Sequence, residues 1–405
     1  MNLDLTNNPA DILGQAGIVR LAYEGGDMQA LLETLVDRVQ SDPDDAAALL
    51  DLSTLMLVTV QPDQGLALQA EALARRRLYR RTHGRGDRLT VLAVVAPGDF
   101  MTNTPIDLLL EGSDVTLWLC YVDAQTQSLA GVPEHDVAFL AIGESEDNLP
   151  ILERAAQLLA DWPRPVVNAA PVSITGLARD ALSHRLEGES SLYIPRTTRA
   201  DREALRALAD GRATLDSLLP GEAWPLIVRP VGTHAGKGLE KIDGPRALAV
   251  YLDAHPDEQL YLAPFVDYSG ADGLYRKQRV AFIDGRAYPS HFAVSEHWMV
   301  HYLSADMTER AERRAEEERW MTGFDNGFAL RHAQAFTALS HRLGLDYFGI
   351  DCAETSDGRL LIFEADVAMI VHALDPAGIF PYKKPAMRKL FEAFVEALAR
   401  RAARP

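Results

Sequence analysis

The stretch from residue 89 to residue 170 alternates apolar runs of strand length with helical patterns. The runs are "LTVLAVVAP", "DVTLWLCYV", "HDVAFLAIG" and "RPVVNAA", and the helical segments "TPIDLLLEG" and "NLPILERAAQLLADW" stand between them. Strands that alternate with helices form a parallel sheet, which helices cover on both faces. No GxGxxG motif follows the first run, so a standard dinucleotide site is excluded.

Residues 10 to 82 are predicted to be helical throughout, because their apolar residues recur at helical spacing. Asp42 is a predicted N-cap followed by Pro43, and Pro62 is predicted to start the next helix. The helices resemble tetratricopeptide hairpins without the full consensus, so they form either a cap on the main body or a module that docks a protein or peptide. The basic run 75–88 is interpreted as a solvated helix end and a linker.

After residue 200 the pattern becomes mixed. Helices are predicted at 201–210, 244–254 and 308–320, and "ALRHAQAFTALSHRLG" is a fourth. The strand "WPLIVRPV" precedes a glycine-rich loop, and "QLYLAPFV", "YRKQRVAFID" and "GRAYPSHFAV" are predicted to form an antiparallel group. "DYFGIDCAETSDGRLLIFEADV" is predicted to be a hairpin that turns at Asp357-Gly358.

This hairpin carries three acids. Glu364 and Asp366 are two residues apart on one strand and therefore share a face, and the turn brings Asp351 opposite them. Burying three carboxylates requires cations, and hard divalent ions with oxygen ligands suit them. Magnesium bound by carboxylates and substrate phosphates is the favoured interpretation, and a salt-bridged strand end is the alternative.

The loop in "IVRPVGTHAGKGLEKID" complements the hairpin. An apolar strand places Arg229 before the loop, and glycines 232, 236 and 238 allow backbone amides to approach an anion. Lys237 adds a positive charge. The GK[ST] ending of a Walker loop is absent, so the loop is either a phosphate-binding element of another kind or an ordinary flexible hairpin.

From about residue 89 to residue 400 the chain resembles the ATP-grasp superfamily, and within it the RimK-like and glutathione-synthetase-like ligases. "PVVNAAPVSITGLARDALSHRL" and "YIPRT" are similar to the segment that joins the family's first domain to its ATP-binding half. "LIVRPVGTHAGKGL" resembles its strand and glycine-rich lid loop. "RKQRVAFIDGRAY" resembles its strand with a phosphate-facing arginine, and "GIDCAE" with "GRLLIFEADV" resembles its magnesium hairpin.

The resemblance implies ATP and Mg²⁺ as cofactors. It implies that Asp351, Glu364 and Asp366 hold magnesium between the β- and γ-phosphates, and that Arg279 and Arg229 are catalytic. The implied nucleotide-binding residues are Arg229, Gly232, Gly236, Lys237, Gly238, Phe265, Val266, Asp267 and Lys277.

The implied fold class is α/β and α+β, an ATP-grasp fold with an all-α N-terminal domain. The predicted domains are a helical domain at 1–86, an α/β domain at 87–200, a lid subdomain at 201–295, and a C-terminal subdomain with the metal hairpin at 296–405.

The chain departs from the family pattern at three positions. Ala181 and Arg229 stand where the family usually has lysine, and Asp366 stands where it usually has asparagine. An arginine fork can still contact phosphate, but alanine cannot. The candidates to replace the missing lysine are Arg179, His184 and Arg185.

The leading functional prediction is an ATP-dependent carboxylate–amine ligase that acts through an acyl phosphate, with small-molecule or peptide substrates. A phosphotransferase on the same nucleotide site and a degenerate ATP-binding scaffold are the alternatives. The formal net charge of -18 argues against nucleic acid as a partner. Two cysteines, no signal-peptide pattern at the start and no long apolar run predict a cytoplasmic protein that spans no membrane, and a homodimer is left open.

Overall fold

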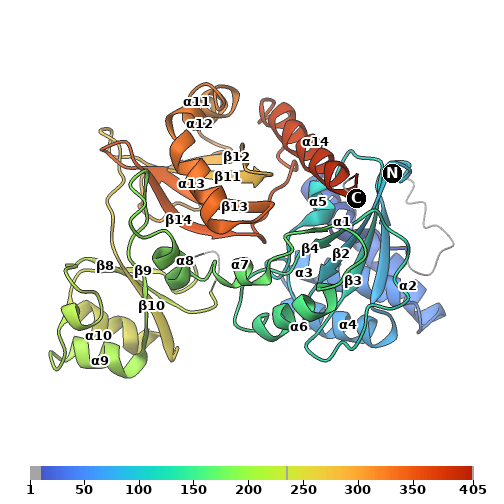
Figure 1. The fold of residues 1–405 in the computed structure, drawn as a ribbon, viewed down its shortest axis with the longest axis horizontal. Helices are drawn as coiled ribbons and strands as arrows, with labels where there is room; N and C mark the ends of the chain where they lie inside the picture. Colours follow the sequence, from blue (N-terminus) through green and yellow to red (C-terminus); the bar gives the residue numbers. More distant parts are fainter. Residues whose placement is uncertain (1–10, 234–235, 404–405) are drawn as a thin grey trace.

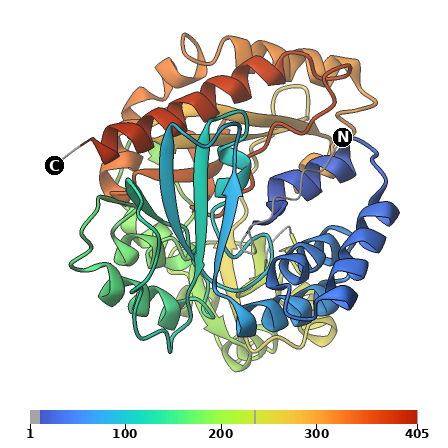
Figure 2. The same ribbon diagram turned by 90° about the vertical axis from the view of Figure 1, so that its right-hand side faces the viewer.

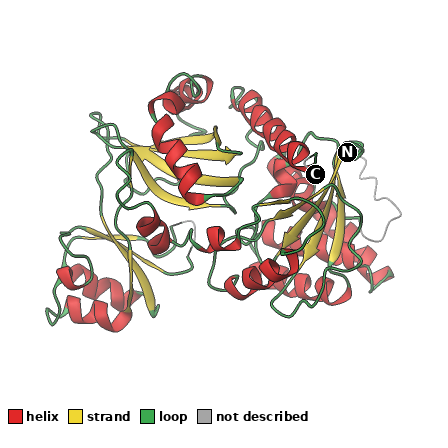
Figure 3. Ribbon diagram, viewed as in Figure 1, coloured by secondary structure: helices red, strands yellow, loops and turns green. Residues whose placement is uncertain are grey.

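The computed structural model describes residues 11–233 and 236–403. Within these residues the strands form three sheets, two of five strands and one of four. Figure 1 shows the first sheet and the N-terminal helices on the right, and the other two sheets on the left, one above the other. Figure 3 shows helices beside all three sheets. The chain is therefore a mixed α/β protein with several sheets, as its sequence predicts.

Four helices precede the first strand of the described chain. The N-cap of α3 is Asp45, whose side chain accepts a hydrogen bond from Ala48 N, so the predicted cap at Asp42 lies three residues too early. Asp42 instead ends the preceding helix and accepts from Asp44 N in the turn. The helix that starts at Pro62 is confirmed. The bounds are α1 Gly14–Tyr23, α2 Met28–Ser41, α3 Ala46–Val58 and α4 Pro62–Arg75.

The first sheet has the strand order β1-β3-β2-β4-β5, and all its pairs are parallel except β1 with β3. The prediction of helix up to residue 82 is wrong here, because residues 78–82 are strand β1. Tyr79 explains the strand: its ring is buried against α3 and α4, its hydroxyl donates to Ala72 O at 3.0 Å, and the backbone pairs with β3. The bounds are β1 Leu78–Thr82, β2 Leu89–Val95, β3 Val115–Tyr121, β4 Val137–Leu140 and β5 Val166–Val167.

Helices cover both faces of this sheet. Alternate residues of β2 and β4 enter two different hydrophobic clusters, and α6 contributes Leu152 and Ala155 to one of them. The C-terminal helix α14 covers the other face. It also packs on β11 (Tyr275–Ile283) and β12 (Arg286–Ser295) of the third sheet, so it joins the two halves of the molecule. Figure 2 shows α14, in red, running past the upper end of the parallel strands. The bounds are α5 Ile106–Leu109, α6 Leu149–Leu159, α7 Pro171–Thr175, α8 Arg179–Arg185 and α14 Lys383–Ala402.

The second sheet, of order β7-β10-β8-β9, is antiparallel and packs against α9 and α10 through a hydrophobic cluster of its own. The third sheet has the order β12-β11-β13-β14-β6. The bounds in the second sheet and its helices are β7 Thr198–Asp201, α9 Arg202–Ala209, η1 Leu215–Ser217, β8 Leu226–Pro230, β9 Glu240–Ile242, α10 Pro245–Ala254 and β10 Gln259–Pro264. Those in the third are β6 Leu192–Tyr193, β11 Tyr275–Ile283, β12 Arg286–Ser295, η2 Tyr302–Ser304, α11 Ala311–Thr322, α12 Phe328–Arg331, α13 Ala333–Leu343, β13 Tyr347–Glu354 and β14 Leu360–Asp366.

The predicted antiparallel group of three strands is divided between these sheets. β10 pairs with β7 and β8, whereas β11 pairs with β12 and β13, because the chain crosses from one sheet to the other after Pro264. The hairpin turn at Asp284-Gly285 is present, with φ of 47° and 77° at the two residues. The β13–β14 hairpin is confirmed. No helix within the described ranges is long and apolar enough to cross a membrane.

Helix α1 is fixed to the rest of the chain by two buried carboxylates. Asp51 of α3 accepts hydrogen bonds from Leu13 N at 2.8 Å and Gly14 N at 3.1 Å. Asp107 of α5 accepts from Ala16 N at 2.6 Å. Both side chains therefore accept hydrogen bonds from N–H groups that have no partner within the helix at the start of α1. Negative charge at this end also interacts favourably with the helix dipole. The helix is held as part of the main body.

Asp51 gives a stability prediction that depends on pH. Burial raises its pKa to about 7, although the two backbone N–H groups favour the ionised form. The folded state thus binds the proton more tightly than the unfolded chain, whose aspartate pKa is about 3.9. The stabilisation from this proton is complete below that value and is lost as the pH rises through about 7. Replacing Asp51 by Asn removes the titration.

We expect the unfolding free energy of wild type minus that of Asp51→Asn to fall by about 2–4 kcal/mol between pH 5 and pH 8. Urea unfolding of both proteins across this range measures the difference. A difference that does not change with pH would show that Asp51 does not titrate in this way.

Candidate active site

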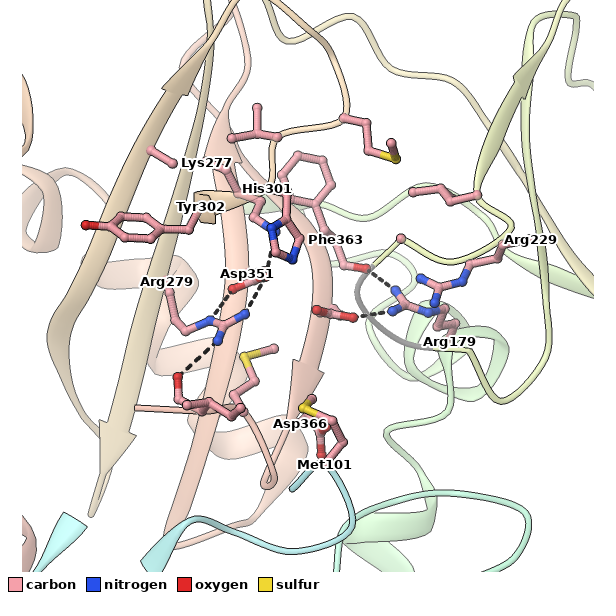
Figure 4. Close-up of a pocket in the computed structure, with 18 of the residues that line it drawn as sticks. Met101, Arg179, Arg229, Lys277, Arg279, His301, Tyr302, Asp351, Phe363 and Asp366 are labelled. Atoms are coloured by element: carbon pink, nitrogen blue, oxygen red, sulfur yellow. Dashed lines mark hydrogen bonds and ion pairs between the residues drawn. The ribbon is translucent and has the colours of Figure 1, made fainter. Parts of the chain in front are cut away.

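A cavity of about 710 Å³ lies where the second and third sheets meet the N-terminal helices and the loop after β2. We call it the central cavity. Strands β8 and β10 form one wall, β11, β13 and β14 form another, and α1 and the loop after β2 close the remaining side. The charged side chains of its described lining are Arg179, Arg229, Lys277, Arg279, Asp351, Glu364 and Asp366. Figure 4 shows the four cations, with Asp351 and Asp366, around one part of the cavity.

Asp351 is the most enclosed of these groups, with 1% of its surface exposed. Arg279 Nε and Nη2 donate to its two oxygens at 2.7 Å and 3.0 Å, and Lys277 Nζ lies 2.9 Å from Oδ2. Burial alone would raise the pKa of Asp351, but the charges of Arg279 and Lys277 outweigh it and hold the pKa well below its usual range. Strand β11 presents both cations because they are two residues apart and share a face.

Glu364 and Asp366 lie on β14. Glu364 faces Asp351 in the strand register, and a bulge at this point sets Phe363 apart from the regular pairing. Arg179 of α8 forms an ion pair with Glu364 and donates to Phe363 O at 3.2 Å. Asp366 accepts from Ala368 N at 3.0 Å. Burial and the nearby charge of Glu364 raise the pKa of Asp366 to about 7.

The three carboxylates do not form a ready metal cluster. Within the described ranges, no three His, Cys, Asp or Glu side chains gather closely enough to hold a metal ion. Asp351 turns to Lys277 and Arg279, and Glu364 turns to Arg179. Asp351 and Glu364 nevertheless lie opposite each other in the strand register, and all three carboxylates line the central cavity. Their role as metal ligands stays a prediction.

Arg229 of β8 lies deep in the wall, with 7% of its surface exposed. It donates to the carbonyl and, at 3.2 Å, to the hydroxyl of Thr233. Its Nε is buried and has no hydrogen-bond partner among the described residues, which do not include 234–235. Burial, together with the charge of Arg179, lowers the pKa of Arg229 to about 10. An uncompensated buried donor next to a cavity is a binding group for an anion.

The glycine-rich loop is only partly at the cavity. Gly232, Gly236 and Gly238 all have positive φ, at 74°, 76° and 66°, which favours glycine at these positions. Gly236 lines the cavity, but the side chain of Lys237 is exposed and lies outside the described lining. Residues 234–235 of the predicted loop are outside the described residues.

An apolar slot adjoins the charged end. Phe265 and Val266 line it, whereas Asp267 is exposed and accepts from Ser269 N at 2.9 Å. Lys241 Nζ lies 4.1 Å from the centre of the Phe265 ring, and Trp298 packs edge-on against the same ring at 5.7 Å. The other apolar lining residues of the slot are Ile227, Ala263, Pro264, Ile362 and Phe363.

Two parts of the site were uncertain or missed in the sequence. Of the three residues considered as replacements for the lysine absent at Ala181, only Arg179 lines the cavity; His184 is exposed, and Arg185 donates to Leu343 O at 3.2 Å. The N-terminal residues in the lining were missed altogether. They are Gln15, Val19, Tyr23, Leu57 and Val58. Helical spacing alone does not tell which distant surface a helix face meets.

No protein-family model matches this chain, and no curated protein matches it significantly. Solved structures do. A RimK domain ATP-grasp protein from Sphaerobacter thermophilus is 16% identical with a TM-score of 0.41 over 76% of this chain and 99% of that one. D-alanine–D-alanine ligase from Bacillus anthracis is 12% identical with a TM-score of 0.47 over 78% and 98%. The same ligase complexed with ATP is 11% identical, with a TM-score of 0.47, over 78% of this chain and 98% of that one. Likeness at this level says nothing about the chemistry of this chain.

Proposed function

We propose that this chain is an ATP- and magnesium-dependent carboxylate–amine ligase whose nucleotide binds in the central cavity. The observation that carries the proposal is the meeting of four cations and three carboxylates at one end of a cavity whose adjoining slot is apolar. A nucleoside triphosphate has the same division, since its base is flat and weakly polar and its phosphates are highly charged. The cavity volume of about 710 Å³ is in the range of small-molecule sites.

The charged end suits phosphate. Four cations against three carboxylates give a formal excess of one positive charge in the described lining, and partial protonation of Asp366 adds to it. Three of the cations are arginines, whose forks bind two oxygens at once. The Nε of Arg229, which has no hydrogen-bond partner in the described part of the chain, would supply a further donor. Phosphate oxygens would compete with Asp351 and Glu364 for the neighbouring cations.

The donor set also suits magnesium. Carboxylate oxygens are the ligands that this hard ion prefers, and it takes few of them when phosphates supply the rest. The raised pKa of Asp366 reflects its burial and its closeness to Glu364, which a cation between them would relieve. Asp351, Glu364 and Asp366 would hold the ion. When bound, magnesium neutralises charge that develops on the transferred phosphoryl group.

The chain's own residues would bind, orient and exclude water. A carboxylate oxygen attacks the γ-phosphorus, the bond to the β-phosphate oxygen breaks, and ADP leaves; Arg279, Lys277 and Arg229 would offset the developing charge. An amine then attacks the acyl carbon, phosphate leaves, and the amine's proton needs an acceptor. His301 lines the cavity, and burial lowers its pKa, so its neutral imidazole can take that proton.

The test is a screen of amino acids and short peptides for phosphate release, with mass detection of the product. We expect ADP, free phosphate and an amide. Glu364→Gln should abolish turnover with the fold intact. Glu354→Gln is the matched control, because Glu354 lies on the same hairpin but pairs with Arg331 and His332 outside the cavity.

Full turnover in Glu364→Gln would overturn the assignment of this site. A stable phosphorylated product without free phosphate would replace the ligase by a phosphotransferase. If calorimetry detects no Mg·ATP binding, both the ligase and the phosphotransferase are rejected.

Arg229 gives a separate prediction about affinity. Arg229→Ala should weaken Mg·ATP binding about 10- to 100-fold, because a buried charge-assisted hydrogen bond contributes about 1.5–3 kcal/mol. Arg229→Lys keeps the positive charge and should lose much less affinity for Mg·ATP. Calorimetric titration of Mg·ATP into the three proteins compares them, with melting temperatures as the folding control. Equal affinity in wild type and Arg229→Ala would remove Arg229 from the nucleotide site.

A further inference from the structure

The side of the central cavity away from the charged residues is built by the N-terminal helices and the loop after β2. Its described lining there consists of uncharged side chains. We call it the apolar lobe, and its members are Val19, Tyr23, Leu57, Val58, Phe100 and Met101. Cavity and lobe are continuous, since Met101 and Asp366 line the same space and appear together in Figure 4.

The geometry points to a carboxylic acid with an uncharged, apolar body as the substrate, its body held in the apolar lobe and its carboxylate directed at the charged end. This deepens the proposed function and rests on it, because it takes the charged end as the place of phosphoryl transfer. The N-terminal helices then select the substrate. They do so from inside the cavity rather than by docking a partner on their outer surface.

The position of the apolar lobe is fixed by packing and by hydrogen bonds to α1. Val19 and Tyr23 are four residues apart, so they share one face of α1. Val19 packs on a buried cluster of Ala16, Leu108 and Leu374, which joins α1 to α5 and to the segment after β14. The start of α1 is fixed by Asp51 and Asp107, as described above. Apolar residues held half-buried against a cavity are expected where an apolar ligand part binds.

The one cation on α1 near the lobe is committed elsewhere. Arg20 lies between Val19 and Tyr23 in sequence, but its guanidinium binds both oxygens of Glu111 at 2.7 and 2.8 Å. It therefore does not offer an anchor for a second charge on the substrate. In the described lining of the lobe, no acidic side chain faces a substrate ammonium group either. A charged body would lose its hydration in the lobe without a partner, which is costly.

The loop after β2 brings the lobe next to the reacting end. Gly143, in the segment after β4, lies between this loop and the segment after β14: a Cβ built on it would lie 2.9 Å from Ala368 Cβ and 3.0 Å from Thr102 O. Met101 belongs to the loop, and Asp366 is the last residue of β14, directly before the second segment. A substrate whose body fills the lobe can therefore reach the carboxylate-and-arginine cluster with its own carboxylate.

The test titrates three probes into the full chain by calorimetry: 3-phenylpropionate, propionate and succinate. We expect 3-phenylpropionate to bind at least about tenfold more tightly than the other two. Val58→Asp, which places a charge in the lobe, should weaken its binding by about tenfold or more. Val60→Asp is the matched control: it makes the same change two residues further on, at a side chain 84% exposed and outside the described lining.

Tyr23→Ala is a second variant in case Val58→Asp does not fold, since Tyr23 is 49% exposed and its ring contacts only His372 among the described aromatic side chains. Tyr23→Ala should also weaken the binding of 3-phenylpropionate. Succinate or propionate binding as tightly as 3-phenylpropionate, or unchanged affinity in the lobe variants that fold, would overturn the inference. A parallel titration of Mg·ATP separates the two proposals. Nucleotide binding without probe selectivity rejects the apolar substrate alone, and probe selectivity without nucleotide binding rejects the ligase.

Discussion

Replacing Arg279 by methionine should destabilise the fold by about 3–5 kcal/mol and abolish ATP turnover. Arg279 makes two of the three ionic contacts to Asp351 and also donates to Ile370 O at 3.0 Å. Without it, Lys277 alone faces a carboxylate that is 1% exposed. A buried charge with an incomplete set of partners carries most of its desolvation cost. Urea unfolding measures the stability, and ADP production measures the activity.

The same strand supplies the control for this experiment. Arg276 is three residues earlier on β11 and pairs with Asp272 and Glu316 outside the cavity. Arg276→Met should cost about 1 kcal/mol or less and keep activity, as is typical of partly exposed pairs. Arg279→Lys should recover part of the stability because one charge returns. A loss of stability in Arg276→Met as large as in Arg279→Met would mean that the burial of Asp351 is not what makes Arg279 important.

The sequence predicts best the elements whose signals are local. The hairpin of β13 and β14 has two local signals: apolar strands, and between them the turn dipeptide Asp357-Gly358. The turn sets the register as far as Cys352 opposite Ile362, but a bulge that skips Phe363 is what brings Asp351 opposite Glu364, and the sequence does not indicate that bulge. The parallel strands between 89 and 167 are equally clear, because buried strands are continuous apolar runs.

Elements that depend on distant partners were not predictable. Strand β1 contains three basic or polar residues after Tyr79, and its sequence resembles the end of a helix; only the pairing with β3 makes it a strand. The division of β10 and β11 between two sheets is also a tertiary property, because each strand pairs with segments far away in sequence. Local spacing does not contain this information.

The site was predictable in its backbone positions and less so in its side chains. Arg229, Lys277 and Arg279 line the cavity, because strand alternation fixes which face they point to. Lys237 and Asp267 are exposed, since loops do not fix the direction of a side chain in this way. Asp351 and Glu364 pair with cations, and Asp366 accepts from a backbone N–H; only the full set of neighbours decides this. The wall made by α1 and α3 had no sequence signal.

The N-terminal helices should be required for a stable, complete cavity, and two truncated chains test this. Every nucleotide contact predicted from the sequence lies beyond residue 175, so the sequence alone suggests that residues 1–82 can be removed without loss of ATP binding. The structure changes this expectation. A fragment of residues 83–405 lacks β1, which pairs with β3 from residue 78 to residue 82, and lacks α1, which forms part of the cavity. We expect it to be insoluble or to melt at least about 10 °C below the full chain.

A fragment of residues 77–405 separates the two losses, because it keeps β1 and removes only the helices. It retains the complete first sheet and all the charged residues of the cavity lining, so it should be more stable than 83–405 and should bind Mg·ATP measurably. Without Val19, Tyr23 and Val58 it should no longer distinguish 3-phenylpropionate from propionate. Thermal melting and calorimetry of the two fragments beside the full chain give all three comparisons. If 83–405 melts with the full chain, β1 is dispensable, and if 77–405 keeps the probe selectivity, the helices do not form the substrate wall.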